Sequence, residues 1–540
     1  MRIAIIGAGV AGLTTAKVLT QAGHQVQVFD RTPDVGGVWS RTRRYPGLTT
    51  QSPKAQYSLS DFAFPKECPE WPSGEQVQAY LAAYTTAFGL DHTLRLNTEV
   101  NTARPNGSTD SGWTLETTGA AGNRTAEDFD RLVVANGVFC EPAIPAYPGT
   151  EEFTAAGGRL CAATEFNDAE EARGKNVLVI GYGKTACDVA AAIGQTAATT
   201  NVIARQLLWK VPRKIGGFLN FKMLLLTRMG EALFRYARLR GFEKFLHGPG
   251  NGLRRRMIDS IGSVSIRQFG LRQLGLLPRG SMEGIVKGAI GLATEGFFEA
   301  VAEGRITVRR DQTITRLLAR EGKPFAQLAD GTTLPADLVV CATGFVQAVP
   351  FLPAQVQERL LDERGNFMLY RQIMPVDIPG LYFNGYNSSF FSPLNAEMAA
   401  LWIAAAIAAA IPLPDTETVR RAVIDQLAFL DYATDRHHCK GTKIIPFSMH
   451  NADEVLADLD LNINVLVRAS HWLNPINPAA YRHLTPALLR RLRSDDTPLS
   501  GSGSTLPQQS HSNANDRTDN GKAVDSMSET VPLKRTRRSL

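Results

Sequence analysis

The hydrophobic positions in the first thirty residues predict a strand, a helix and a second strand. "MRIAIIG" is an almost wholly apolar short run, which is typical of a strand buried in a parallel sheet. "GLTTAKVLTQAG" has the spacing of an amphipathic helix and ends at Gly23. "HQVQVFD" predicts the second strand, which ends at Asp30. We expect this unit to open a doubly wound sheet.

A second unit of the same kind begins near Lys175. "VLVIGYGKTACDVA" (177–190) reads as an apolar strand, a glycine turn and a helix, and "NVIAR" (201–205) predicts the return strand. Two further apolar runs, "FDRLVVANG" (129–137) and "ADLVVCATG" (336–344), each end at a glycine. We interpret both as strands with ligand-facing ends, because ligands bind beyond the carboxyl ends of strands in such sheets.

The first glycine turn has the spacing of a dinucleotide site. Gly7, Gly9 and Gly12 form Gly-x-Gly-x-x-Gly directly after the strand and at the start of the helix. The first glycine permits a tight turn, the second lets the backbone approach a pyrophosphate, and the third lets the helix pack on the strand. The helix N-terminus offers free N–H groups and a positive dipole to the phosphates. Asp30 is expected to accept hydrogen bonds from ribose hydroxyls.

The second turn has the similar motif Gly-x-Gly-x-x-Ala, at Gly181, Gly183 and Ala186. Its return strand ends in Arg205 rather than in an acid. An acid there would repel a 2′-phosphate, whereas an arginine pairs with it through two parallel hydrogen bonds. The sequence therefore predicts NADPH at the second turn and FAD at the first, with hydride passing between them. Three basic residues are secondary candidates for the 2′-phosphate: Lys210, Arg213 and Lys214.

These units predict an α/β fold with two Rossmann-type dinucleotide-binding domains, in which the FAD domain is interrupted by an inserted NADPH domain. A helical C-terminal part and a disordered tail follow, because the last residues are polar and nearly without aromatic side chains. The expected boundaries are the FAD domain at 1–170 and 331–425, the NADPH domain with its basic helical insertion at 171–330, the helical region at 426–493 and the tail at 494–540.

Composition narrows the class of protein. The 540 residues are 44% hydrophobic and 20% charged, and the net charge of +6 is too weak to argue for nucleic acid. The six cysteines include no Cys-x-x-Cys pair, and "HHCKGTK" (437–443) with His450 matches no standard metal spacing, so no metal site is expected. The chain opens directly with a strand rather than with a secretory signal, so we expect a cytoplasmic protein with reduced thiols.

Two segments raise the question of a membrane. The longest apolar run, "MAALWIAAAIAAAIPLP" (398–414), falls short of the ~20 residues that a span needs and is broken by Pro412, so a buried core helix is predicted. Residues 205–256 are rich in arginine and lysine, and part of them has an amphipathic, basic pattern. A solvated helical face over the active site is the simpler interpretation, and peripheral contact with a membrane surface is the alternative.

Together, the motifs make the chain resemble the class B flavoprotein monooxygenases: the flavin-containing monooxygenases and their Baeyer–Villiger and N-hydroxylating relatives. Besides the two turns, the matching stretches are "GGVW" (36–39), "RYPGLTTQSPKAQYSLSDFAFP" (44–65), "VVANGVFCEPAIP" (133–145), "DLVVCATGF" (337–345) and "SPLNAEMAALW" (392–402). The resemblance implies further cofactor-binding residues within these stretches: Gly37, Trp39, Gly137, Gly344 and Glu397.

The resemblance also implies a mechanism. NADPH reduces FAD, O₂ adds to the reduced ring as a C4a-(hydro)peroxide, and one oxygen atom passes to a small organic substrate while the other leaves as water. The protein holds NADP⁺ in place and excludes water. Gln51 and Asp61, in the flavin-facing segment, are the expected catalytic residues.

Two departures from the family pattern bear on the reaction. Gln51 stands where the flavin-containing enzymes carry asparagine and the Baeyer–Villiger enzymes carry aspartate, so its side chain has no charge. Ala156 and Ala162 replace the Phe and His of the fingerprint Phe-x-Gly-x-x-x-His-x-x-x-aromatic, whereas Gly158 and Phe166 keep its other positions. We therefore favour oxygenation at N or S, or hydroxylation, over ester formation from a ketone. The alternatives are an FAD/NADPH oxidoreductase without oxygen insertion and a degenerate flavin-binding scaffold.

Overall fold

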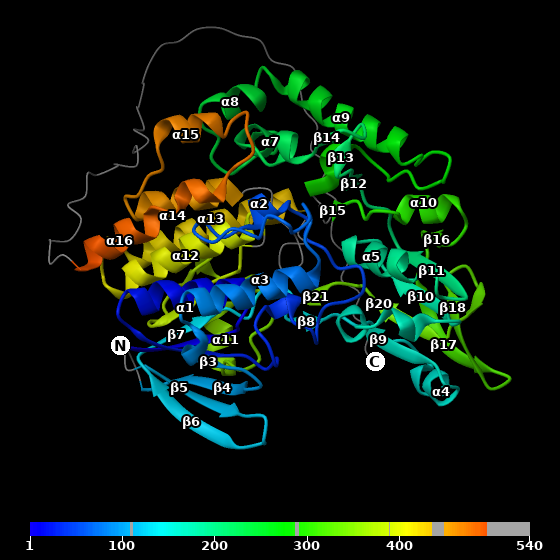
Figure 1. Cartoon of the computed structure of the whole chain (residues 1–540), viewed down its shortest axis with the longest axis horizontal. Helices are drawn as coiled ribbons and strands as arrows, with labels where there is room; N and C mark the ends of the chain where they lie inside the picture. The colour runs from blue at the N-terminus through cyan, green and yellow to red at the C-terminus, as the bar shows by residue number, and fades with distance from the viewer. Residues whose placement is uncertain (108–111, 287–290, 388, 435–447, 494–540) are drawn as a thin grey trace, which may run out of the picture. The chain divides into compact units, whose positions relative to one another are not determined.

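The computed structural model describes residues 1–107, 112–286, 291–387, 389–434 and 448–493 (Figure 1). Residues Met1–Leu499 group as one compact unit. The histidine stretch at 437–443 and the tail at 494–540 lie outside the described residues, so the disorder expected of the tail stays a prediction.

The first large sheet is parallel and is built around the N-terminal strand, in the order β24-β7-β1-β2-β3. Its strands are β1 (Arg2–Ile6), β2 (Gln25–Phe29), β3 (Leu94–Arg95), β7 (Arg131–Val134) and β24 (Leu381–Phe383). Ile6 of β1 lies beside Phe29 of β2 in the register. Gly7 and Asp30, each one residue further, therefore reach the same carboxyl edge, where the strand order reverses around β1.

Helix α1 (Val10–Gln21) leaves the first glycine turn and is mostly buried. Its partner is α12 (Ser392–Ile407), which packs along it (Figure 1). Nearly every residue of α12 is buried, since a helix that is apolar all round belongs in a core. The prediction of a buried core helix within 398–414 is therefore confirmed, with the helix ending at Ile407.

The second large sheet is also parallel, in the order β16-β11-β10-β20-β9. Its strands are β9 (Arg159–Ala162), β10 (Asn176–Ile180), β11 (Thr199–Ala204), β16 (Thr307–Arg310) and β20 (Leu338–Cys341). Ile180 lies beside Ile203 and Cys341, so the turn after β10 again meets the carboxyl ends of its neighbours. Helix α5 (Lys184–Ile193) leaves this turn. The two predicted Rossmann-type sheets are thereby confirmed.

The second sheet takes in more of the chain than the sequence indicated. The expected NADPH domain spans 171–330, but β9 and β20 pair within its sheet and extend it from Arg159 to Cys341. The apolar pattern of a buried strand is the same for either sheet, and only strand pairing distinguishes them. The run at 336–344, assigned from the sequence to the FAD domain, therefore ends beside the second glycine turn and not beside the first.

Smaller sheets and short helices complete the two domains. One three-stranded sheet contains β4 (Glu99–Pro105), β5 (Trp113–Thr118) and β6 (Arg124–Phe129), and another contains β17 (Ile314–Arg320), β18 (Lys323–Leu328) and β19 (Thr333–Pro335). The two-stranded pair of β8 (Glu141–Pro142) and β21 (Phe345–Val346) joins the two segments that cross between the large sheets. The other helices are α2 (Lys54–Tyr57), α3 (Gly74–Ala87), α4 (Thr150–Ala155), α10 (Phe297–Ala302) and α11 (Ala354–Leu360).

The basic insertion is helical but does not form one long amphipathic helix. It contains α6 (Lys222–Leu225), α7 (Arg228–Ala232), α8 (Phe242–Leu246) and the longer α9 (Asn251–Gln268), with the short strands β12 (Lys210–Val211), β13 (Lys214–Ile215), β14 (Leu219–Asn220) and β15 (Gly291–Leu292). Thr227 starts a new helix, because its hydroxyl accepts a hydrogen bond from the N–H of Gly230. Gly241 has a φ of 46°, which breaks the helical conformation again before α8 begins.

The C-terminal part of the described chain is helical, as predicted. Its helices are α13 (Thr416–Ala433), α14 (Ser448–Asp458), α15 (Val465–Ser470) and α16 (Leu484–Arg493). Helix α14 packs against α12, where Trp402 donates its indole N–H to the carboxylate of Asp458 over 3.0 Å. Within the described ranges, no helix combines the length and the apolar character needed to cross a bilayer.

Candidate functional site

The three glycines of the first turn have different neighbours. A Cβ on Gly7, whose φ is +112°, would lie 2.4 Å from the carbonyl oxygen of Ala135, and a Cβ on Gly12 would lie 1.8 Å from the carbonyl oxygen of Gly7. Both positions therefore require glycine so that strand and helix can pack. A Cβ on Gly9 would meet only the Cα and the N of Gly37, at ordinary contact distances of 3.6 and 3.9 Å. Gly9 is thus not needed for internal packing.

The first turn opens into a cavity with a volume of about 250 Å³. Most of the predicted flavin-site residues line it: Gly7, Gly9, Asp30, Gly37, Trp39 and Gly137. Gly12 lies behind the turn, where it lets α1 approach β1. The sequence motifs of the first unit are therefore brought together at one site by the register of the first sheet.

The first turn fits the pyrophosphate of a dinucleotide. No side chain caps α1 at Gly9, so no side-chain oxygen occupies the N–H groups of its first turn. The open side of Gly9 leaves room for phosphate oxygens to approach them. The residues present therefore fit FAD at this cavity.

Asp30 shapes the turn as well as facing the cavity. Its Oδ2 accepts a hydrogen bond from the N–H of Ala8 at 2.6 Å, and its Oδ1 accepts from the N–H and the hydroxyl of Thr32 at 2.8 and 2.7 Å. A carboxylate has about four acceptor positions, so one remains beyond these three bonds. The ribose contact expected of Asp30 stays a prediction.

Two residues of the cavity wall, Asn136 and Arg43, were not among the expected cofactor-binding residues. The side chain of Asn136 donates to the carbonyl oxygen of Ala348 over 2.9 Å and accepts from the Tyr386 hydroxyl at 2.8 Å, which ties the loop after β7 to the segment before α11. Arg43 lines the cavity and donates to the carbonyl oxygen of Phe139 over 2.6 Å. Their long sequence separations leave no local signal, although the basic run after "GGVW" is visible in the sequence.

The second turn repeats the geometry of the first. A Cβ on Gly181, whose φ is +120°, would lie 2.6 Å from the carbonyl oxygen of Ala342, whereas a Cβ on Gly183 would meet nothing within 4 Å. Ala186 is fully buried against the sheet. No side chain caps α5 at Gly183, so this helix also offers its first N–H groups to an anion. The turn therefore fits a second dinucleotide.

The basic residues near the second turn divide into exposed and buried ones. Arg205 is exposed and directly follows β11, where a 2′-phosphate contact is expected. Lys214 is also exposed. Lys210, by contrast, is buried and donates to the carbonyl oxygen of Tyr182 over 2.8 Å. Arg205 and Lys214 therefore stay candidates for the phosphate, and Lys210 supports the turn from within.

A polar cluster that is partly buried joins the second turn to the flavin-facing segment. Lys184 on α5 forms an ion pair with Asp188 over 2.5 Å and donates to the Thr49 hydroxyl over 3.3 Å. Arg213 donates to the same hydroxyl over 2.8 Å and pairs with Glu295 over 3.1 Å. Burial raises the pKa of Asp188 and lowers the pKa of Lys184, and their direct contact opposes both shifts. This cluster was not foreseen, because its members come from four separate segments.

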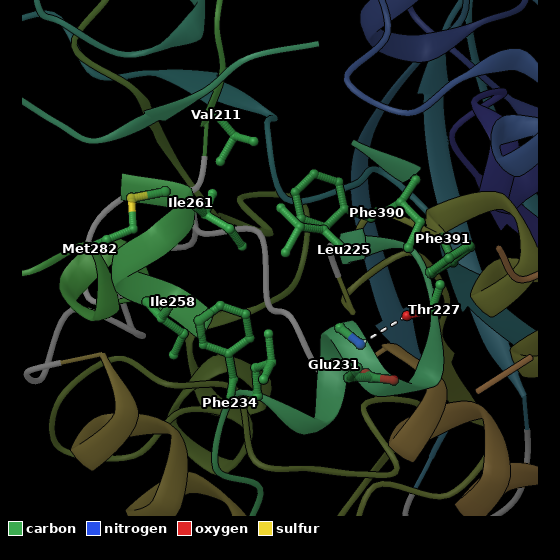
Figure 2. A pocket seen from close by; sticks show the side chains of 13 residues that line it. Val211, Leu225, Thr227, Glu231, Phe234, Ile258, Ile261, Met282, Phe390 and Phe391 are labelled. Carbon is green, nitrogen blue, oxygen red and sulfur yellow. Dashed lines mark hydrogen bonds between the residues drawn. The ribbon is translucent and has the colours of Figure 1, made fainter. Parts of the chain in front are cut away.

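A smaller cavity of about 40 Å³ lies between the basic insertion and the start of α12 (Figure 2). Its wall is mainly apolar and includes Val211, Leu225, Phe234, Ile258, Phe390 and Phe391. Phe390 and Phe391 directly precede Ser392, which lines the larger cavity. Consecutive residues at the start of α12 therefore belong to the walls of the two cavities.

Glu231 is the one carboxylate among the described residues that line the small cavity. It accepts the N–H of Met449 at 2.9 Å, and one of its oxygens lies 3.6 Å from Nδ1 of His450. Nε2 of His450 is 2.6 Å from Glu243. Burial alone would lower the pKa of His450, but the two carboxylates raise it to about 10. His450 is therefore charged at neutral pH, and it offsets the charge of Glu231 beside the apolar wall. Among the described residues, no group of His, Cys, Asp or Glu is placed to hold a metal ion.

The comparisons with known proteins point to flavin monooxygenases. The family model for flavin-binding monooxygenase-like proteins matches residues 1–241. The probable flavin-containing monooxygenase 1 of Arabidopsis thaliana is 27% identical over 85% of this chain and 92% of its own length. Residues 1–241 thus match the flavin-binding monooxygenase-like family, and the chain is similar to a flavin-containing monooxygenase over most of its length. It is an NADPH-dependent flavin monooxygenase whose cofactors are FAD and NADPH.

A further relative and a solved structure are also similar to this chain. The dimethylaniline monooxygenase [N-oxide-forming] 4 of Mus musculus is 25% identical over 82% of this chain and 79% of its own length. The NADP⁺-bound cyclohexanone monooxygenase from Rhodococcus sp. Phi1 has the same fold, with a TM-score of 0.61 and 18% identity over 85% of this chain and 97% of that one.

Gln51 of this flavin monooxygenase connects the flavin-facing segment to the insertion. Its Oε1 accepts a hydrogen bond from the N–H of Leu292 at 3.1 Å. The next residue, Ser52, donates to the carbonyl oxygen of Phe390 over 2.6 Å. Gln51 therefore lies close to the segment that separates the two cavities, but it is not part of the wall of either. Its catalytic role stays a prediction.

The positions of Asp61 and Glu397 do not support the roles expected of them. Asp61 forms an ion pair with Lys17, whose ammonium group lies over the ring of Phe88, and neither residue is part of the wall of the 250 Å³ cavity. Glu397 is buried on α12 and accepts hydrogen bonds from the N–H and the hydroxyl of Ser60 at 2.8 and 3.0 Å. Ser60 thus contacts α12 through Glu397, and Asp61 contacts α1 through Lys17. Tertiary packing decides this orientation, which the motif could not reveal.

Glu397 gives the folded protein a measurable pH dependence. Burial raises its pKa to about 7, against the opposing effects of Lys17 and Ser60. A raised pKa means that the folded state holds the proton more tightly than the unfolded state, so stability falls as pH rises from 4.5 towards 7. At 1.36 kcal/mol per pKa unit, the full effect is about 3 kcal/mol. We expect Glu397→Gln to remove this slope in urea unfolding followed from about pH 5 to about pH 8.

The matched control is Glu358→Gln, which removes an exposed carboxylate from α11. This variant should keep the slope of the unmodified protein. If Glu397→Gln and Glu358→Gln have the same pH dependence, Glu397 is not the group that titrates.

Two further motif residues lie away from the cofactor cavity. Gly344 has a φ of +93°, and its carbonyl oxygen accepts the N–H of Ala143 at 3.0 Å. It therefore belongs to the β8–β21 link, and its position does not support the cofactor contact expected of it. Ala162 ends β9 and is buried, and its N–H is bound by Glu165 over 2.9 Å. Its methyl side chain offers no hydrogen bond where the family carries a histidine.

Proposed function

We propose that this flavin monooxygenase transfers one oxygen atom to a soft nitrogen or sulfur atom, or hydroxylates a carbon, of a small, mostly apolar substrate. The overall reaction consumes the substrate, O₂, NADPH and a proton, and yields the oxygenated substrate, NADP⁺ and water. The observation that carries the substrate class is the apolar cavity beside the first residues of α12. An uncharged or weakly basic molecule fits this wall best.

The residues around the cavity support this choice. Glu231 is already engaged by the Met449 N–H and by His450, so it does not call for a cationic ligand. Gln51 carries no charge, and Ala162 holds no proton. A charged site that steers attack on a carbonyl is therefore poorly supported. The N-oxide-forming relative from Mus musculus belongs to the same family and agrees with this preference.

When bound, FAD activates oxygen. This chain binds and orients the cofactors and the substrate, and it excludes water. Gly9 and the N-terminus of α1 are the proposed holders of the FAD pyrophosphate, and Gly183 and α5 those of NADPH. Phe390 and Phe391 exclude water from the small cavity at the point where it approaches the larger one. Together with the Lys184–Arg213 cluster, Gln51 keeps the insertion against the flavin-facing segment.

A substrate panel tests the proposal. Amines, sulfides and ketones are incubated with the enzyme, NADPH and O₂, and products are examined for a gain of one oxygen atom. We expect amines or sulfides to be converted with NADPH consumption that depends on the substrate. Efficient conversion of ketones to esters with amines and sulfides untouched would contradict the proposal, as would NADPH oxidation without any oxygenated product.

Arg205 is proposed to select NADPH over NADH. Removal of a charge-assisted bidentate pair costs about 1.5–3 kcal/mol, so Arg205→Ala should weaken NADPH binding roughly ten- to a hundredfold and leave NADH binding nearly unchanged. Arg421→Ala, on the exposed face of α13, is the matched control. Flavin reduction in stopped flow gives both affinities. If Arg205→Ala weakens the binding of NADPH and NADH equally, Arg205 does not contact the 2′-phosphate.

A further inference from the structure

Exposed apolar side chains gather on the basic insertion and on α15. Phe242 and Phe245 on α8 are 44% and 43% exposed, and Leu253 on the first turn of α9 is 54% exposed. Leu466 and Leu473, from α15 and the residues after it, are 80% and 75% exposed. Large apolar side chains at such exposures, in one region, are a signature of an interaction surface.

These side chains belong to one surface. The rings of Phe242 and Phe245 stack with centroids 5.4 Å apart, and Phe242 contacts Trp472 at 6.3 Å, which places α8 beside the end of α15 (Figure 1). The ring of Phe245 in turn lies against Gly250, just before α9. We call these five residues, Phe242, Phe245, Leu253, Leu466 and Leu473, the apolar face.

Basic residues outnumber acidic ones in and next to the segments that carry the apolar face, where Asp259 and Asp460 are also exposed. Residues 235–256 contain seven arginines or lysines and a single acid, Glu243. Glu243 is buried and bound to His450, so it does not balance the surface. The basic residues that are exposed within this stretch are Arg235, Arg238, Arg240, Lys244, Arg255 and Arg256. Residues 461–475, which include α15, add one arginine and no acid.

We propose that the apolar face and its ring of basic residues dock this enzyme on the surface of an anionic lipid membrane. Phenylalanine, tryptophan and leucine side chains enter the boundary between headgroups and acyl chains, while arginine and lysine stay at the anionic headgroups. The charge argues for lipid over a second copy of this chain, because two copies would bring like charges together. The described chain has no bilayer-spanning helix, so the contact is peripheral.

Vesicle co-sedimentation of the FAD-loaded full chain tests the proposal. We expect the protein to sediment with mixed vesicles of phosphatidylcholine and phosphatidylglycerol at low salt, and to stay in solution with vesicles of phosphatidylcholine alone. Added salt should release it, because screening weakens the basic contacts. Absence of sedimentation with the anionic vesicles, or equal sedimentation with both kinds, would overturn the proposal.

Two double variants separate the two contributions. Arg255→Glu with Arg256→Glu should lower the affinity for anionic vesicles by roughly thirtyfold or more, since each basic residue near such a surface contributes about 1 kcal/mol. Leu466→Ser with Leu473→Ser should weaken binding even at low salt. The matched control, Ile144→Ser with Val346→Ser, removes exposed apolar side chains near the β8–β21 link and should bind as the unmodified protein does. Equal binding by all variants would overturn the proposal.

Two further measurements address other occupants of the surface. Truncation after Arg493 should leave vesicle binding unchanged; binding that appears only after truncation would assign the surface to the chain's own C-terminal segment and overturn the proposal. Sedimentation equilibrium should give the same mass for the unmodified protein and for Leu466→Ser with Leu473→Ser. A larger assembly that is lost in this variant would assign the surface to a second copy instead.

Discussion

Gly9→Val is expected to give a folded protein that purifies almost without FAD. The valine Cβ would meet no atom of the protein closer than the Cα of Gly37, at 3.6 Å. The φ of Gly9 is −80°, which any residue adopts. The added side chain instead fills the open side of the turn and keeps phosphate oxygens away from the N–H groups at the start of α1. Loss of two charge-assisted hydrogen bonds costs about 3–6 kcal/mol, so FAD affinity should fall more than a hundredfold.

Gly12→Ala supplies the contrast within the same turn. Its Cβ would lie 1.8 Å from the carbonyl oxygen of Gly7, so α1 must move away from β1, at a cost of about 1–3 kcal/mol or more. The flavin absorbance of purified protein and the circular dichroism melting curve separate the two effects. We expect Gly9→Val to lose colour and keep its secondary structure, and Gly12→Ala to unfold at a lower temperature. A yellow Gly9→Val protein would show that the flavin does not bind at this turn.

Gly183→Val should give a yellow enzyme that NADPH no longer reduces. A Cβ at this position would meet nothing within 4 Å, and the φ of Gly183 is −71°. The fold and the FAD cavity should therefore be untouched, while the N–H groups at the start of α5 lose access to the NADPH pyrophosphate. By the same reasoning as at the first turn, NADPH affinity should fall roughly a hundredfold or more.

Anaerobic stopped-flow reduction measures this loss. The control is chemical reduction by dithionite, which does not use the NADPH site and should bleach the flavin of Gly183→Val at the normal extent. Normal reduction of Gly183→Val by NADPH would move the nucleotide site away from the second turn. Loss of FAD from this variant would instead mean that the two turns are not independent.

The local pattern of the sequence was enough to predict both dinucleotide turns. Each depends on an apolar strand, glycines at a fixed spacing and the start of a helix, all within about fifteen residues, because backbone conformation and close approach are set by neighbours in the chain. The structure places Gly7, Gly9, Gly181 and Gly183 as that reasoning requires. The buried helix α12 was equally predictable, since its apolar run has the length of a core helix.

Contacts between distant segments were not predictable in this way. The assignment of 336–344 to the FAD domain was wrong, because strand pairing, and not apolar pattern, places β20 in the second sheet. Asp61 and Glu397 match the family motif in residue type. In the structure, however, Asp61 pairs with Lys17 of α1 and Glu397 of α12 binds Ser60, and neither lies at the cavity. The direction of a side chain depends on how its element is rotated against the core, and short motifs do not encode that rotation.

By itself, therefore, the sequence determined the fold class and the two glycine turns, because both depend on residues that lie close together in the chain. Only the tertiary structure decided which residues line the two cavities, how Lys184 and Arg213 meet at Thr49, and that exposed leucines and phenylalanines share one basic surface. Those features arise when segments hundreds of residues apart are packed together. Burial and charge pairing between these distant segments stabilise such features, and a local sequence pattern does not predict which segments will meet.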